Sequence, residues 1–133
     1  MAAVIVDTNI LLDIFTQDPV WEERSAAAIA AIADVAALVV NPIIYAELSV
    51  GIKTIEALNE FLSTDFRRDP LPWEAAFVAG KAFLAYRRRG GLKTSPLPDF
   101  YIGAHAAVEA MQILTRDPTR YHSYFPSVKI IEP

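Results

Sequence analysis

The 133-residue sequence contains no cysteine, only two histidines and no long uninterrupted apolar run. The lack of cysteine excludes disulfides and thiolate metal sites, and it suits a reducing environment. The longest nearly apolar stretch, residues 26–40, is interrupted by Asp34 and is shorter than the ~20 residues that a membrane span needs. No basic region precedes the first apolar residues, so we expect no signal peptide. These absences predict a cytoplasmic protein that does not associate with membranes.

Basic residues are fewer than acidic ones, and the two kinds are unevenly distributed along the chain. The net charge of −4 argues weakly against nucleic-acid binding. However, residues 1–80 contain four Lys or Arg and twelve Asp or Glu, whereas residues 81–133 contain eight and four. The basic residues of the second part include Arg87, Arg88, Arg89, Lys93, Arg116 and Arg120. A basic rim beside an acidic centre would bind phosphate, although residues 87–89 equally fit a solvated helix end.

Hydrophobic periodicity and capping signals predict short strands that alternate with helices. We expect strands at 4–6, 37–40, 112–115 and 128–131, and a short edge strand near 69–72. We expect helices at 18–33, 42–51, 54–62, 73–89 and 98–111, and a short helix within 116–126. In the 73–89 helix, Phe77, Phe83 and Leu84 should face inward. The alternation predicts a single domain over residues 1–133, a three-layer α/β/α fold with a mostly parallel sheet.

Two acidic residues follow directly after expected strands. Asp7 ends the strand at 4–6, and Asp117 lies just beyond the strand at 112–115. Ligands of parallel sheets bind beyond the carboxyl ends of the strands, so both acids should lie at one edge. Each also has a simpler interpretation, because Asp7 could cap a helix and Asp117 could open a turn before Pro118.

Two further acids lie on expected helices. Glu47 shares a face with Ile43 and Ile44, where a desolvated carboxylate needs a metal or a basic partner. Asp99 falls in a first helical turn, which by itself is an ordinary place for an acid. On the same face, Gly103 leaves room for the close approach of another element.

Together, these carboxylates suit a hard cation such as Mg²⁺ or Mn²⁺. The two histidines, His105 and His122, are too scattered for a zinc site, and His105 is expected to be a hydrogen-bonded helix residue rather than a base. The predicted catalytic residues are Asp7, Glu47, Asp99 and Asp117, with Asp7, Asp99 and Asp117 as metal ligands and Thr8, Asn9 and Thr115 as supporting residues.

Four segments occur in a familiar order: VDTNILLD (6–13), YAEL (45–48), LPDFYIGAHA (97–106) and TRDP (115–118). Together they resemble the PIN-domain VapC toxins, the ribonucleases of type II toxin–antitoxin pairs. The tail at 120–126 resembles one bacterial and archaeal subgroup of them. Some relatives carry another acid two residues beyond the position of Asp117, where this chain has Thr119.

The resemblance implies a PIN-like sheet of five parallel strands flanked by helices. It also implies Mg²⁺- or Mn²⁺-dependent endonucleolytic cleavage of an RNA substrate, and hence inhibition of translation. A homodimer and inhibition by a cognate antitoxin protein are implied as well. The family's acidic positions map onto Asp7, Glu47, Asp99 and Asp117.

Two other functions remain open at this point. An aspartyl-phosphate phosphatase also has an aspartate after its first strand, but its chemistry needs a second aspartate where this chain has Asn9, and a lysine near the later acids. A non-catalytic PIN-fold binding module would act by dimerising or by holding a partner helix. Retention of all four carboxylates argues against the module.

Overall fold

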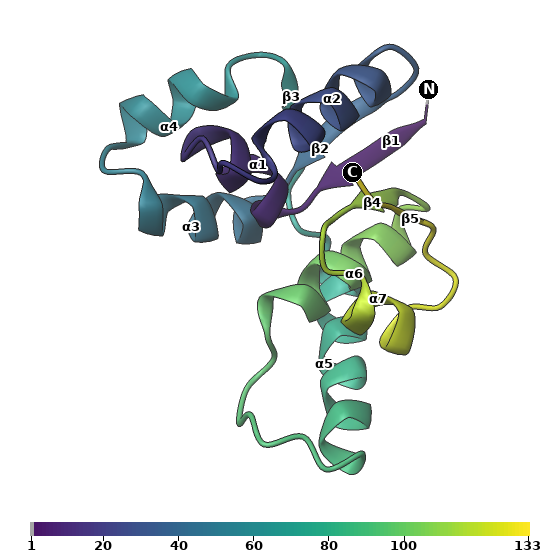
Figure 1. The fold of residues 1–133 in the computed structure, drawn as a ribbon. Coiled ribbons are helices and arrows are strands. Elements are labelled where there is room, and N and C mark those ends of the chain that lie inside the picture. The colour runs from purple at the N-terminus through teal and green to yellow at the C-terminus, as the bar shows by residue number, and fades with distance from the viewer. Residues whose placement is uncertain (1) are drawn as a thin grey trace.

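A computed structural model describes residues 2–133, in which a five-stranded parallel sheet lies between two groups of helices (Figure 1). The strands are β1 (Ala3–Val6), β2 (Ala37–Val40), β3 (Phe66–Arg68), β4 (Gln112–Leu114) and β5 (Ile130–Ile131). Their order is β3-β2-β1-β4-β5, so β1 is central and pairs with both β2 and β4. The predicted three-layer α/β/α architecture with about five parallel strands is confirmed.

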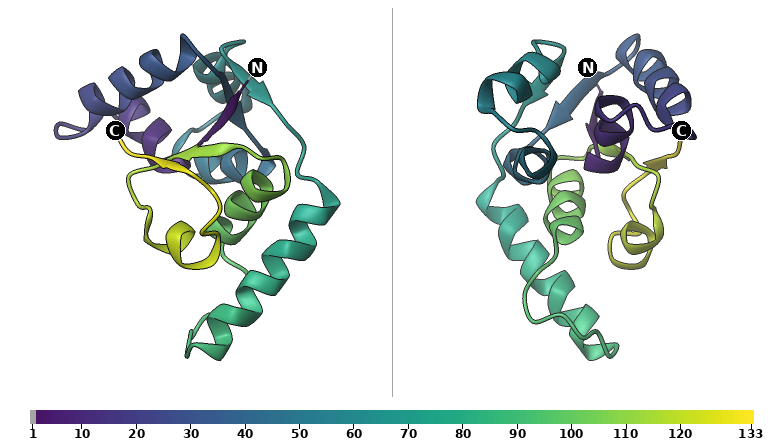
Figure 2. Two further views of the ribbon diagram at one scale, coloured as in Figure 1. Left: turned by 90° about the vertical axis from the view of Figure 1, so that its right-hand side faces the viewer. Right: turned by 60° about the vertical axis from the view of Figure 1, so that its left-hand side comes forward.

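Seven helices occur among residues 2–133. They are α1 (Thr8–Phe15), α2 (Glu22–Ala33), α3 (Pro42–Gly51), α4 (Ile55–Leu62), α5 (Trp73–Arg88), α6 (Pro98–Val108) and α7 (Thr119–Tyr124). Helices α1 to α4 gather on one side of the sheet, and α5 to α7 gather on the other (Figures 1 and 2). No helix in this part of the chain is long and apolar enough to cross a bilayer.

Local capping chemistry explains where most helices begin. The Asn41 side chain accepts a hydrogen bond from the Ile44 backbone N–H at 3.0 Å, as the Asn-Pro signal predicted. The helix predicted to begin at Asp18 instead begins at Glu22, because the Asp18 carboxylate accepts from the backbone N–H groups of two residues in a preceding turn. An additional helix, α1, follows directly after Asp7.

Two other boundaries differ from the prediction. The edge strand β3 precedes the proline-rich segment 69–72 instead of lying within it, because proline has no N–H to donate to a neighbouring strand. Helix α6 ends at Val108 rather than near Met111, and Ala110 has a positive φ of 54° that terminates the helical path.

The buried face of α5 is made of small side chains. Ala75, Ala79 and Ala82 are buried, whereas Phe77 is 67% exposed and Leu84 is 41% exposed. The prediction that Phe77 and Leu84 face inward is therefore wrong; Phe83, also predicted inward, is partly buried against the core. Helix α5 packs along α6, and alanines on that face let the two backbones approach closely.

The close approach expected at Gly103 comes from the ring of Phe125, which follows α7. A Cβ atom added at Gly103 would overlap that ring, and both residues are buried. This contact seats α7 on α6, and it thereby sets the position of the residues that α7 contributes to the site described below.

Replacing Gly103 by alanine should therefore destabilise the protein, even though alanine favours helices. We expect Gly103→Ala to lower the free energy of unfolding by ~1–3 kcal/mol, because the ring must shift in a packed core. The matched control is Gly80→Ala in α5, where an added Cβ would have no atom within 4 Å other than those of neighbouring residues of its own helix backbone. The control should gain up to ~1 kcal/mol from helix propensity. Urea unfolding measures both, and a gain in stability in both variants would contradict the contact.

Candidate active site

Strand β1 carries Asp7 to the carboxyl edge at the centre of the sheet. The side chain is 5% exposed, and its carboxylate accepts three hydrogen bonds. The Thr8 backbone N–H donates to Oδ1 at 2.7 Å, and the hydroxyls of Thr115 and Tyr121 each donate to Oδ2 at 2.9 Å. Burial, helped by the charge of Asp99, raises the pKa of Asp7 to about 6 despite these bonds. Asp7 is thus a buried carboxylate rather than only a helix cap.

Thr8 links Asp7 to Glu47 on α3. Its backbone N–H bonds Asp7, while its hydroxyl donates to Glu47 Oε1 at 2.7 Å. Glu47 is partly buried, and this burial raises its pKa, as does the nearby charge of Asp99. Neither Asp7 nor Glu47 forms an ion pair with a basic side chain anywhere in residues 2–133.

Asp99, in the first turn of α6, interacts electrostatically with the other acids. Burial raises the pKa of Asp99, and the neighbouring charge of Asp117 adds to the rise. The charge of Asp99 in turn adds to the burial effect on the pKa values of Asp7 and Glu47. Asp117 itself is exposed in the loop after β4. The structure therefore brings four carboxylates from four segments to one edge of the sheet.

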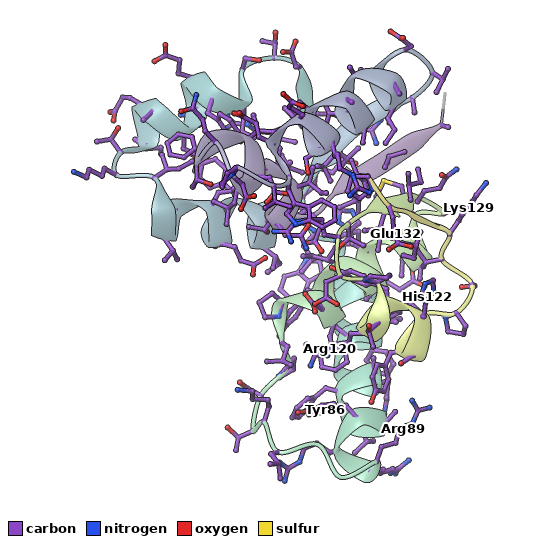
Figure 3. All side chains as sticks on the ribbon, in the orientation of Figure 1. Tyr86, Arg89, Arg120, His122, Lys129 and Glu132 are labelled. Carbon is purple, nitrogen blue, oxygen red and sulfur yellow. The ribbon has the colours of Figure 1, made fainter. Side chains whose placement is uncertain are left out.

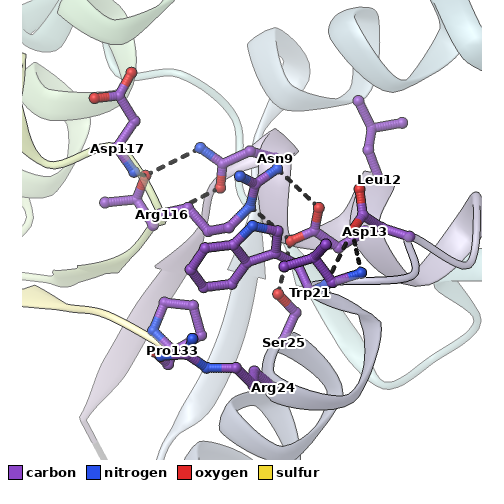
Figure 4. Close-up of polar contacts among 12 residues, drawn as sticks. Asn9, Leu12, Asp13, Trp21, Arg24, Ser25, Arg116, Asp117 and Pro133 are labelled. Atoms are coloured by element: carbon purple, nitrogen blue, oxygen red, sulfur yellow. Dashed lines mark hydrogen bonds and ion pairs between the residues drawn. The ribbon is translucent and has the colours of Figure 1, made fainter.

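Thr115, at the end of β4, connects these segments. Its hydroxyl donates to Asp7, and it accepts from the side chain of Asn9 at 3.2 Å and from the backbone N–H of Asp117 at 3.0 Å. The side-chain Oδ1 of Asn9 accepts a hydrogen bond from the backbone N–H of Arg116 at 3.2 Å. The loop that carries Asp117 is therefore hydrogen-bonded to α1 at Asn9 (Figure 4).

One basic side chain reaches the acids. Arg120 of α7 donates from Nη1 to Asp99 Oδ2 at 3.2 Å, and both side chains are about one third exposed. Within residues 2–133, no three Asp, Glu or His side chains already lie close enough together to enclose an ion. The donor set consists of carboxylate oxygens. Two of these carboxylates, those of Asp7 and Glu47, are buried or partly buried and have no basic partner within residues 2–133. This chemistry fits a hard divalent ion such as Mg²⁺ or Mn²⁺.

Sequence reasoning missed Tyr121 as a residue of the site. The side chain is fully buried in α7, and its hydroxyl donates to Asp7. Burial raises the pKa of Tyr121 well above its usual range, and the charge of Asp7 acts in the same direction, so the phenol stays a donor. The i, i+4 spacing of Tyr121 and Phe125 indicates a buried face, but it does not indicate that the hydroxyl reaches Asp7.

Arg116, which we expected in a phosphate-binding rim, is paired with a buried acid. Its guanidinium donates to both carboxylate oxygens of Asp13, at 2.8 and 2.9 Å, and lies 5.0 Å from the centre of the Trp21 ring (Figure 4). Asp13 is 2% exposed and also accepts from the hydroxyl of Ser25 at 2.7 Å. The pair ties the loop after β4 to α1 and α2, and it holds two of the three guanidinium nitrogens of Arg116.

His105 is a hydrogen-bonded helix residue, as predicted. Its Nδ1 lies 3.1 Å from the side-chain nitrogen of Asn41, whose oxygen caps α3. Because the amide nitrogen can only donate, Nδ1 is the acceptor and the ring is neutral, and burial lowers the pKa of His105 accordingly. The contact joins α6, which carries Asp99, to α3, which carries Glu47.

Comparison with known proteins gives one family and a consistent fold. The PIN domain family model matches residues 4–123. Among solved structures, the chain is similar to one in VapBC2 from Rickettsia felis bound to a promoter DNA fragment (TM-score 0.76, 17% identity, 98% of each chain covered). It is also similar to one in VapBC-1 from nontypeable Haemophilus influenzae (TM-score 0.73, 18% identity, 98% of this chain and 97% of that one covered). No curated protein gave a significant match.

A third similar structure is FitAcB from Neisseria gonorrhoeae (TM-score 0.68, 21% identity, 96% of each chain covered). At these identities the likeness concerns the fold, whereas the family model covers most of this sequence.

The raised pKa of Asp7 predicts that the metal-free protein becomes less stable as the pH rises between about pH 4 and pH 6. The folded state binds more protons than the unfolded chain in this range, so each step upward favours unfolding. For Asp7, a pKa raised from 3.8 to about 6 corresponds to about 3 kcal/mol. Urea unfolding in EDTA across this range measures the effect.

The Asp7→Asn variant cannot titrate at this position and should lack that part of the pH dependence. Asp34→Asn, at an exposed helix end, is the matched control and should keep the wild-type profile. Parallel profiles for wild type and Asp7→Asn would show that Asp7 is not the buried titrating group.

Proposed function

Because the chain belongs to the PIN domain family, we propose that it is the toxin of a type II toxin–antitoxin pair. In this proposal it is a metal-dependent endoribonuclease that cleaves RNA phosphodiester bonds and so inhibits translation in the cytoplasm. The observation that carries the proposal is the set of interacting carboxylates at the sheet edge, with Asp7 linked to Glu47 through Thr8 and neither paired with a basic residue within residues 2–133.

Asp7, Asp99 and Asp117 are the proposed ligands of Mg²⁺ or Mn²⁺, and Glu47 would complete a second site or orient water. The chemistry that such an ion supplies when bound is activation of water and neutralisation of charge on the phosphate. Thr115 and Tyr121 occupy Oδ2 of Asp7, and Thr8 occupies one position on Oδ1. The remaining acceptor capacity of Asp7 therefore lies mainly on Oδ1, because a carboxylate oxygen accepts about two hydrogen bonds.

The hydrogen bonds of the supporting residues orient these carboxylates and favour their ionised forms, against the opposing effect of burial. Three donors fix Asp7, and the Thr8 hydroxyl fixes Glu47. Thr115 and Asn9 hold the loop of Asp117 against α1. Preorganisation of this kind limits the rearrangement needed when a ligand binds. Thr119 lies where some relatives have another acid, so the proposed ligand set does not include that position.

The proposed partners are RNA, a cognate antitoxin protein and a second copy of the chain. The antitoxin is suggested by the similar structures, one of which is described as a toxin–antitoxin complex and another as a member of the VapBC family of toxin–antitoxin systems. The homodimer is supported by apolar side chains that lie exposed along α5. Trp73 is 93% exposed and Phe77 is 67% exposed, and large apolar side chains gathered on a surface commonly mark protein interfaces.

Cleavage of mixed RNA in Mg²⁺ or Mn²⁺, with EDTA as control, tests the proposal. Asp7→Asn and Asp99→Asn should each lose more activity than the ~10–100-fold typical of losing a residue that only supports a ligand. Both variants should remain folded, because asparagine keeps the side-chain volume. Asp65→Asn, at an exposed position before β3, is the matched control and should cleave like wild type.

Three results would contradict the proposal in different ways. Undiminished cleavage by Asp7→Asn or Asp99→Asn would refute the assigned residues. Absence of metal-dependent cleavage by the wild-type chain, freed of any bound inhibitor, would favour a non-catalytic binding module. Hydrolysis of p-nitrophenyl phosphate without RNA cleavage would favour a phosphatase.

A further inference from the structure

A cavity of about 230 Å³ opens beside the proposed metal ligands, between α5, α6 and α7. Asp99 and Asp117 line one part of it, and Arg120 lines it as well. The rings of Tyr86, from α5, and Tyr124, from α7, complete the wall. Aromatic surface, one guanidinium and two of the four acids therefore share a single hollow.

The aromatic rings of this cavity contact one another and two arginines. The rings of Tyr86 and Tyr124 meet edge to face with centres 6.3 Å apart, and both also pack on the buried ring of Phe100. The guanidinium of Arg89 lies 4.8 Å from the centre of the Tyr124 ring, and that of Arg120 lies 5.8 Å from the Tyr86 ring. Figure 3 shows Arg120, Tyr86 and Arg89 gathered on the side of the molecule formed by α5 to α7.

Arg120 has binding capacity to spare. A guanidinium carries several N–H donors, and within residues 2–133 only Nη1 of Arg120 is hydrogen-bonded, to Asp99. Asp99 is also a proposed metal ligand, so a cation bound there would compete with Arg120 for the same carboxylate. Arg87 and Arg88, in the last turn of α5, and Arg89 add positive charge along the same helix end.

We propose that this cavity is the subsite for the nucleotide next to the phosphate that is cut, in a single-stranded segment of RNA. The inference rests on the proposed ribonuclease function. Arg120 binds a phosphate oxygen through the N–H groups that Asp99 leaves free, and the base packs on the rings of Tyr86 and Tyr124. Single strands bind proteins through stacking on aromatic and arginine side chains, because their bases are not buried in a duplex.

RNA fits this surface better than a peptide does. A phosphate beside a stackable base matches a guanidinium beside two aromatic rings, and the position next to Asp99 and Asp117 places that phosphate at the proposed reaction centre. An acidic peptide could pair with Arg120, but its own acids would be repelled by Asp99 and Asp117, which line the same cavity. The occupant is therefore the substrate, and Arg120 and Tyr124 are its binding residues.

The charge can be tested by the salt dependence of binding. A fluorescein-labelled single-stranded RNA of mixed sequence is titrated with the full chain in EDTA, which prevents cleavage, at several salt concentrations. Arg120→Gln should reduce the slope of log affinity against log salt by ~0.7, the value for one lost phosphate contact on a single strand. Arg120→Lys should keep the slope. Arg24→Gln, which removes the same charge from α2, should leave it unchanged.

The ring is tested separately. Tyr124→Leu should weaken RNA binding about 5-fold or more by removing a stacking surface, without changing the salt slope. Tyr124→Phe keeps the ring and its packing on Phe100, so it should bind like wild type. In Mg²⁺ or Mn²⁺, Arg120→Gln should raise KM for cleavage more than it lowers kcat. Direct Mn²⁺ titration should show that Arg120→Gln binds the ion at least as tightly as wild type, because Asp99 is freed.

The outcomes separate this inference from the function on which it rests. Normal RNA affinity and salt slope in both Arg120→Gln and Tyr124→Leu, in a wild-type chain that cleaves RNA, would overturn the subsite and leave the ribonuclease standing. The cavity would then be free for a protein partner instead. A wild-type chain that neither binds nor cleaves RNA would overturn both proposals.

Discussion

The structure depends on one constraint, which is a carboxylate buried at the end of the central strand, with no basic partner among residues 2–133. Burying an unpaired charge costs several kcal/mol, and hydrogen bonds offset only part of that cost. The chain supplies three donors to Asp7 from three places in the sequence: the start of α1, the end of β4 and the middle of α7. Asp7 is thus hydrogen-bonded to residues of α1, of the loop after β4 and of α7, which fixes the relative positions of these elements.

Around Asp7, polar contacts between other elements fix the positions of the remaining acids of the site. Asn41 and His105 join α3 to α6, the helices that carry Glu47 and Asp99. Asp13 and Arg116 clamp the loop of Asp117 to α1 and α2. Each of these four residues is hydrogen-bonded to another side chain of the protein. These hydrogen bonds hold close together the elements that carry the carboxylates, which would otherwise repel one another.

Local signals predicted the elements whose cause is local. The Asn-Pro pair before α3 and the apolar strands β1 and β2 are read from neighbouring residues, and the rule for parallel sheets placed Asp7 and Asp117 at one edge. The inward face of α5 could not be read this way, because alanines are buried there only by the close approach of α6. Likewise, Asp13 and Arg116 are separated by 103 residues, and Tyr121 and Asp7 by 114. Only the tertiary fold brings such pairs together.

A cluster of carboxylates has an inherent difficulty as a site for cutting RNA, because it repels the phosphate it must approach. Two sources of positive charge can remove that repulsion, a bound cation and a nearby arginine, and both would contact Asp99. Arg120 pairs with Asp99, whereas Asp7 and Glu47 pair with no basic side chain in the part of the chain that the structure describes. A cation that takes over Asp99 would free the guanidinium at the edge of the proposed subsite for the phosphate. Competition for one carboxylate would thereby couple the loading of the metal to the readiness of the substrate subsite.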